Sequence, residues 1–145
     1  AEEAGAVYTD PDQAREFIEA TALDILACSF GTVHGLYKGE PHLSFDVLGA
    51  IRDRIKVPLV MHGGSGVSDE DYVKAINAGI RKVNYYTYGA KFAGEAAAET
   101  VERIRTSGSG QPVYWHDLTC AAYDRLVEDF TSVIKVFANG AEPLA

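Results

Sequence analysis

The chain has 145 residues, and 47% of them are hydrophobic, which is enough for one domain with a buried core. Its net charge of -8 and the absence of a basic cluster make nucleic acid an unexpected partner. No apolar run approaches the roughly 20 residues that cross a bilayer, and residues 1–4 begin no signal peptide. We therefore expect a cytoplasmic chain without a membrane partner, in which Cys28 and Cys120 are reduced, partly buried thiols.

The first part of the chain predicts a helix, a strand and a second helix. Asp10 can cap a helix that starts at Pro11, and its expected buried stripe is Ala14, Phe17 and Ile18. Residues 23–30 form an apolar run that ends at Gly31 and reads as a buried strand. Residues 44–55 then read as a helix with three inward side chains, namely Phe45, Leu48 and Ile51.

The rest of the chain continues the alternation of strands and helices. Residues 57–61 predict a second strand, and Ser68 caps a helix over 69–77 that Gly79 closes. Residues 80–85 predict a third strand. Two long helices follow, over 88–106 and 117–137, and a Gly/Ser-rich loop joins them.

This alternation predicts an α/β fold with a parallel sheet. The repeat of about 25 to 30 residues per βα unit is typical of a (β/α)₈ barrel, although a small doubly wound sheet gives the same pattern. A closed barrel usually needs roughly 250 residues, and three strands cannot close one. We therefore expect residues 1–145 to be a portion of a single barrel, with about three βα units plus a C-terminal helix.

Two histidines and an asparagine follow the three predicted strands. His34 lies in residues 31–35, His62 in residues 62–66 and Asn84 at the end of the third strand. Active sites of parallel barrels lie at the carboxyl ends of the strands, so the two imidazoles could share one metal ion such as zinc. A catalytic zinc site would need a third protein ligand and an open position.

The Gly-Gly-Ser-Gly run at 63–66 leads into the helix capped by Ser68, and its backbone N–H groups could hold a phosphate. More ordinary interpretations stand beside these: structural histidines, a flexible glycine loop, and a turn residue at Asn84. We expect His42 and His116 to be surface residues. Packing and the rim of the site are the expected places for Tyr85, Tyr86 and Tyr88.

Four segments resemble the class II aldolase family, in particular its fructose- and tagatose-bisphosphate branches. They are residues 8–11 (YTDP), 31–39 (GTVHGLYKG), 58–66 (PLVMHGGSG) and 79–84 (GIRKVN). The resemblance covers nearly the whole chain. It implies that residues 1–145 are the C-terminal half of a single (β/α)₈ barrel in a homo-oligomeric, cytoplasmic enzyme of carbohydrate metabolism such as glycolysis.

The resemblance also assigns roles to residues. It implies that His34 and His62 are ligands of the catalytic metal, usually Zn²⁺, and that a monovalent cation lies near the phosphate. Asn84 would face the enediolate region and Thr87 would reach the phosphate. The remaining implied substrate contacts are Gly35, Gly63, Gly64, Ser65, Tyr85 and Tyr86.

The implied reaction is the reversible cleavage of a ketose 1,6-bisphosphate, such as fructose 1,6-bisphosphate, to dihydroxyacetone phosphate and an aldehyde phosphate. The family's Asp-His pair, which supplies an acid/base and a further zinc ligand, has no counterpart among these 145 residues. The family's catalytic glutamate loop would lie before Ala1. We therefore expect no catalytic acid/base in this chain and no turnover by it alone. A truncated half-barrel that binds phosphate or metal, or a structural module that pairs with a partner chain, remains an alternative.

The family pattern differs at one further place. Residues 85–88 read Tyr-Tyr-Thr-Tyr, where many members carry small residues before the threonine and an acidic one after it. Bulky rings beside the substrate would affect which sugar is accepted. The sequence therefore leaves open which phosphorylated ketose is the substrate.

Overall fold

The computed structural model describes residues 8–37 and 39–141. The chain divides into two compact units, one ending at Tyr85 and the other beginning at Tyr86. The prediction that residues 1–145 form part of one barrel domain stays a prediction. Among the described residues, none of the helices combines the length and the apolar character needed to span a membrane.

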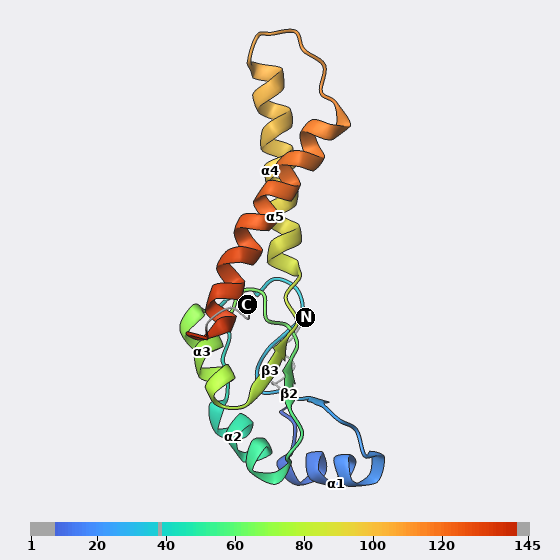
Figure 1. The fold of residues 1–145 in the computed structure, drawn as a ribbon, viewed down its shortest axis with the longest axis vertical. Coiled ribbons are helices and arrows are strands. Elements are labelled where there is room, and N and C mark those ends of the chain that lie inside the picture. Colours follow the sequence, from blue (N-terminus) through green and yellow to red (C-terminus); the bar gives the residue numbers. More distant parts are fainter. Residues whose placement is uncertain (1–7, 38, 142–145) are drawn as a thin grey trace. The chain divides into compact units, whose positions relative to one another are not determined.

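In its described residues, the first unit is built on a parallel sheet of three strands, in the order β1 (Leu26–Ala27), β2 (Leu59–Met61) and β3 (Ile80–Val83). Strands β2 and β3 run side by side in Figure 1. Leu59 of β2 is in register with Leu26 of β1 and with Ile80 of β3. The predicted α/β class with a parallel sheet is confirmed.

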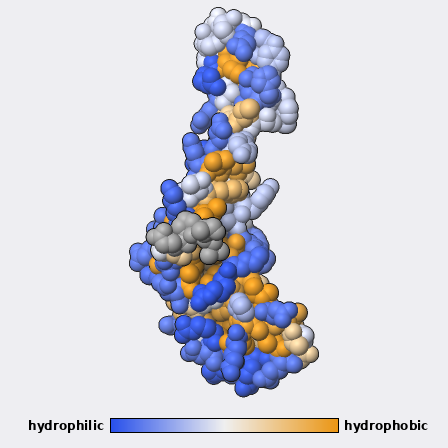
Figure 2. Space-filling model, in the orientation of Figure 1, coloured by the Kyte–Doolittle hydropathy of each residue, from blue (hydrophilic) through white to orange (hydrophobic). Residues whose placement is uncertain are grey.

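Strand β1 differs from its prediction. The expected buried strand over 23–30 is reduced to two residues, and burial alternates: Leu26, Cys28 and Phe30 are buried, while Leu23 and Ile25 are 46% and 41% exposed. In the described part of the chain β1 is an edge strand that pairs only with β2, so it has a strand neighbour on one side only. Figure 2 shows apolar surface on the first unit.

Helix α1 precedes the first strand, and two further helices connect the strands. Each of the three begins directly after a capping residue. They are α1 (Pro11–Thr21), α2 (Phe45–Arg54) and α3 (Asp69–Asn77), capped by Asp10, Ser44 and Ser68. The Asp10 carboxylate accepts hydrogen bonds from the backbone N–H groups of Asp12 and Gln13, at 3.0 and 2.9 Å. Such caps satisfy donors that have no partner within the helix.

The expected buried stripe of α1 is wrong in part. Ala14 is buried, Ile18 is half-buried and Phe17 is 49% exposed. Helix α1 packs against α2 near the open side of β1, where too little of the described chain covers the Phe17 ring.

The core of the first unit lies between the sheet and helices α2 and α3. Its largest fully buried side chains are Phe30, Leu48, Ile51, Leu59, Met61 and Ile80. All three residues of β2 are buried, and Met61 directly precedes His62. Burying one such side chain contributes roughly 1.5–3 kcal/mol to the stability of the fold. The burial of β2 therefore holds the backbone at His62 in place.

The second unit is a hairpin of two long helices, α4 (Thr87–Thr106) and α5 (Trp115–Ala138), which pack side by side in Figure 1. Gly89 is buried against Phe130, where an added Cβ would lie 2.8 Å from the ring. Both predicted helices are confirmed, with bounds that differ by one or two residues.

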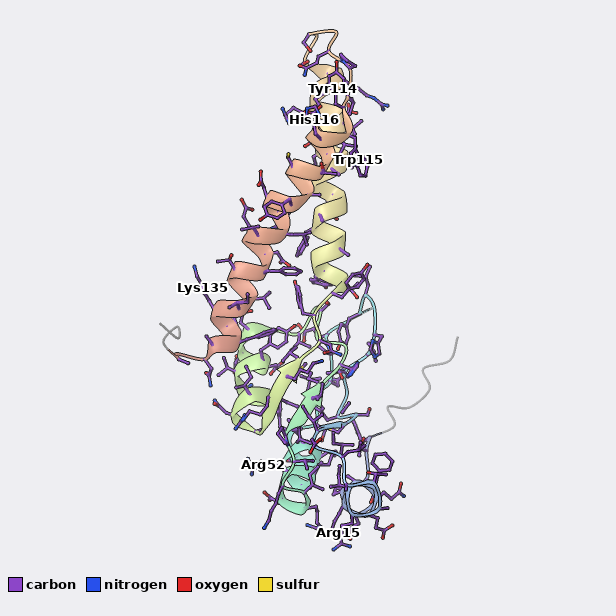
Figure 3. All side chains as sticks on the ribbon, turned by 45° about the vertical axis from the view of Figure 1, so that its right-hand side comes forward. Arg15, Arg52, Tyr114, Trp115, His116 and Lys135 are labelled. Atoms are coloured by element: carbon purple, nitrogen blue, oxygen red, sulfur yellow. The ribbon has the colours of Figure 1, made fainter. Side chains whose placement is uncertain are left out.

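The start of α5 carries a group of exposed rings, which Figure 3 labels. Trp115 is 78% exposed, and the rings of Tyr114 and His116 stack with centroids 5.4 Å apart. His116 is a surface residue, as predicted. Cys120 on α5 is exposed, so the expectation of a partly buried thiol is wrong there. Cys28 is buried, and both thiols are free.

Candidate metal and phosphate site

The parallel sheet brings His34, His62 and Asn84 to the same edge, because they follow β1, β2 and β3 respectively. The rings of His34 and His62 have centroids 5.5 Å apart and planes inclined by 59°. The Asn84 N–H donates to the Met61 carbonyl at 2.9 Å, which continues the pairing of β2 and β3 by one residue. The predicted convergence of the two imidazoles is therefore present in the structure.

Both histidines line a cavity of about 290 Å³ at this edge of the sheet. The other lining residues are Ala27, Cys28, Ser29 and Thr32, which belong to β1 or to the segment after it. His34 is exposed and His62 is half-buried, so a small ligand can reach both rings.

The loops that carry the two histidines are bonded to each other through Tyr37. The Tyr37 hydroxyl accepts a hydrogen bond from the Val33 N–H at 3.1 Å and donates one to the Gly63 carbonyl at 2.8 Å. Val33 precedes His34 and Gly63 follows His62. The tyrosine therefore helps to set the separation of the two imidazoles, a role that the sequence analysis did not assign to it.

Gly63 is the point at which these loops touch. Its φ is +65°, and an added Cβ would lie 2.3 Å from the Val33 carbonyl oxygen. Only glycine allows this backbone shape and this approach together. Gly35 also has a positive φ, of +93°, but an added Cβ there would meet nothing within 4 Å.

Asn84 connects His62 to β3. Its side-chain nitrogen lies 3.1 Å from Nδ1 and 3.0 Å from Nε2 of His62, so the carboxamide is in contact with the imidazole ring. Its side-chain oxygen accepts a hydrogen bond from the Lys82 ammonium. Asn84 is thus more than a turn residue after a strand.

Gly64 is closely packed between two elements. Its N–H donates to the Asn84 carbonyl at 3.3 Å, and its carbonyl accepts from the Tyr72 hydroxyl of α3. An added Cβ would lie 2.9 Å from Val83 Cγ1. In this structure the Gly64 amide is engaged with the chain, so its predicted contact with substrate stays a prediction.

The two histidines fit part of a zinc site. With Zn–N distances of about 2.0–2.1 Å and tetrahedral angles, two ligating imidazoles have ring centroids roughly 5 Å apart, close to the separation observed here. Within the described ranges, no group of three or more His, Cys, Asp and Glu side chains is placed to hold an ion. The described residues therefore bring two imidazole rings together, and their role as metal ligands stays a prediction.

Cys28 lines the same cavity and is buried. Burial raises the pKa of its thiol to about 11, because the thiolate is poorly solvated there. At neutral pH Cys28 is accordingly a neutral, apolar wall of the cavity.

The remaining predicted site residues lie in different surroundings. Ser65 is buried and Tyr85 is half-buried in the first unit. Tyr86, which is 77% exposed, and Thr87 belong to the second unit, at the start of α4. Their contacts with substrate stay predictions. His42 is exposed, as expected of a surface residue.

We expect Gly63→Ala to destabilise the chain more than Gly35→Ala. Both substitutions place alanine at a positive φ, at a shared cost of about 1–2 kcal/mol. Gly63→Ala also forces the loops apart, which adds roughly 1–3 kcal/mol. Urea unfolding of both variants measures the difference, and equal losses of stability would show that the contact with Val33 is not tight.

We expect Cys28 to resist alkylation at pH 8, and its rate to rise with pH toward about 11, where its thiolate forms. The unfolded thiol ionises at lower pH than the folded one, so the stability that Cys28 contributes should fall as pH rises toward that value. Iodoacetamide labelling of Cys120→Ser, which keeps only Cys28, measures the rate, with Cys28→Ser as the matched control. Rapid labelling of Cys28 in folded chain at pH 8 would contradict the assignment.

The family described as fructose-bisphosphate aldolase class-II matches residues 1–139 of this chain. The Escherichia coli K12 protein YdjI is 54% identical over 84 residues, which make up 58% of this chain and 30% of YdjI. This chain therefore spans well under two thirds of the length of that relative.

Solved structures agree with the family match. The crystal structure of the YdjI aldolase from E. coli K12 has a TM-score of 0.74 and 37% identity, and the match covers 92% of this chain and 46% of that one. A putative fructose-1,6-bisphosphate aldolase from Coccidioides immitis has a TM-score of 0.70 and 26% identity, over 93% and 45% of the two chains. Fructose-bisphosphate aldolase from Campylobacter jejuni has a TM-score of 0.72 over 96% and 49%, and at 20% identity it shows the fold alone.

The described strands and helices fit a part of a (β/α)₈ barrel, as the resemblance implied. The matched residues include all four segments that carried the resemblance. The chain belongs to the class II fructose-bisphosphate aldolase family.

Proposed function

We propose that this chain carries part of the metal and phosphate site of an aldolase that reversibly cleaves a phosphorylated ketose, such as fructose 1,6-bisphosphate. The observation that carries the proposal is the pair His34 and His62 on neighbouring strand ends, with ring centroids 5.5 Å apart at a shared cavity. Family membership supports the reaction class. The particular sugar and the metal are parts of this proposal.

In this proposal His34 and His62 bind Zn²⁺ through neutral imidazole nitrogens. Zinc, when bound, would supply a Lewis acid for the ketone oxygen of the substrate. The chain's own contribution is to hold the two rings at a fixed separation, through the burial of β2 beneath His62 and the Tyr37 hydrogen bonds beside His34.

The phosphate of the substrate is assigned to Gly35 and to the loop 63–66 that precedes α3. The substrate contacts of Tyr85, Tyr86 and Thr87 are separate predictions from the family resemblance. Asp69, Glu70 and Asp71 occupy the first turn of α3, and their carboxylates already offset the positive end of the helix dipole. Binding of an anion at this loop would therefore depend more on loop amides and hydroxyls than on the helix dipole. A monovalent cation near the phosphate belongs to the same proposal.

Asn84 is assigned to the negative charge that develops on the substrate as the carbon–carbon bond breaks. Its NH₂ group lies on the His62 side of the carboxamide and is a hydrogen-bond donor. A fixed donor directed at developing negative charge stabilises the transition state more than the ground state, and this lowers the activation barrier.

Proton transfer requires a group that these 145 residues do not supply in the family pattern, since they contain no Asp-His pair. We expect the purified 145-residue chain, with zinc and fructose 1,6-bisphosphate, to show no turnover in a coupled assay for dihydroxyacetone phosphate. Turnover of about 1 s⁻¹ or more is an ordinary enzymatic rate, and it would contradict the claim that these residues lack the proton-transfer group.

We expect the chain to bind Zn²⁺ in calorimetry, and His34→Ala and His62→Ala each to lower the affinity by at least about tenfold, because each leaves a single imidazole. His42→Ala and His116→Ala are the matched controls, since both residues are exposed and lie outside the cavity. Loss of affinity in the controls, or unchanged affinity in both site variants of a folded chain, would count against the proposed metal site.

A further inference from the structure

Lys82 contacts the candidate site through Asn84. It lies on β3 two residues before Asn84, so the two side chains leave the same face of the strand. Its ammonium donates a hydrogen bond to Oδ1 of Asn84. Nδ2 of the same carboxamide faces the imidazole of His62, at 3.1 and 3.0 Å from the two ring nitrogens.

A carboxamide has two orientations of nearly the same shape, which exchange its oxygen and its NH₂ group. An ammonium group has three donors and no acceptor, so it can bond only to the oxygen. With Lys82 on one side, the oxygen of Asn84 turns toward the lysine and the NH₂ group toward His62. The reverse orientation would place donors against donors at Lys82.

We propose that Lys82 is a positioning residue that keeps Asn84 a hydrogen-bond donor on the His62 side. This inference rests on the proposed function, in which Asn84 meets an oxyanion of the substrate. In the reverse orientation a carbonyl oxygen would face that oxyanion and repel it. The bond to an ionised donor is stronger than a neutral one, so the lysine can set the orientation although it is exposed.

The orientation of Asn84 can be measured without metal or turnover. In the 145-residue chain, NMR should show NOEs from the Asn84 NH₂ protons to the ring protons of His62. In Lys82→Met, which removes the ammonium, these NOEs should fall by about half as both orientations become populated. Lys82→Arg keeps a side chain with donors only and should restore them.

A second variant predicts a reversal. Lys82→Glu introduces a side chain with acceptors only, so the Asn84 NH₂ group should turn toward position 82 and its NOEs to His62 should disappear. Lys56→Met, at an exposed lysine between α2 and β2, is the matched control and should leave the NOEs unchanged. The backbone amide spectrum of each variant shows whether the fold is kept.

Unchanged NOEs to His62 in folded Lys82→Met and Lys82→Glu would overturn the role of Lys82. If only one of these variants folds, its NOEs decide the matter, and Lys82→Arg tests recovery. The result is separate from the proposed function: loss of zinc binding in the calorimetric test would remove the metal site but leave the NOE pattern in place. Conversely, zinc binding with an orientation independent of Lys82 would keep the metal site and reject this inference.

Discussion

Parallel pairing of β1, β2 and β3 sends the carboxyl ends of the three strands to one edge of the sheet, and the candidate site depends on this arrangement. The hydrogen bond from the Asn84 N–H to the Met61 carbonyl carries the pairing past the end of β3. It fixes Asn84 beside His62. A slip of one residue in this register would turn Lys82 and Asn84 to the opposite face together and separate both from the imidazole.

The helices could be predicted from sequence because their signals are local. Asp10 and Ser68 each cap the helix that follows, within the same short segment, and no distant contact is needed to place the start. Strand β1 and the Phe17 ring could not be predicted in the same way. Their burial depends on cover from other elements, and in the described chain β1 has a neighbour on one side only.

The site could be predicted in part for the same reason. His62 directly follows β2, and His34 lies in the loop after β1; each precedes a glycine, which is a local pattern, and their ring centroids are 5.5 Å apart. The hydrogen bond by which Tyr37 connects the two loops could not be predicted, because its partner Gly63 is 26 residues away along the chain. The contact of Lys82 with Asn84 was not predicted, although its signal was local. Lys82 lies two residues before Asn84, and residues two apart along a strand point to the same face.

The two imidazoles are held with unequal firmness, and this matters for how an ion would bind. His62 follows a fully buried strand, whereas His34 lies in an exposed loop that hydrogen bonds from Tyr37 connect to its neighbour. An ion bound by both rings would cross-link the two loops. Part of its binding free energy would be used to order the His34 loop, since flexible groups lose conformational entropy when they are fixed. Tyr37 would reduce that cost by ordering the loop beforehand. If the proposed ligand set is right, the affinity for the ion would therefore depend on a hydroxyl group that makes no contact with it.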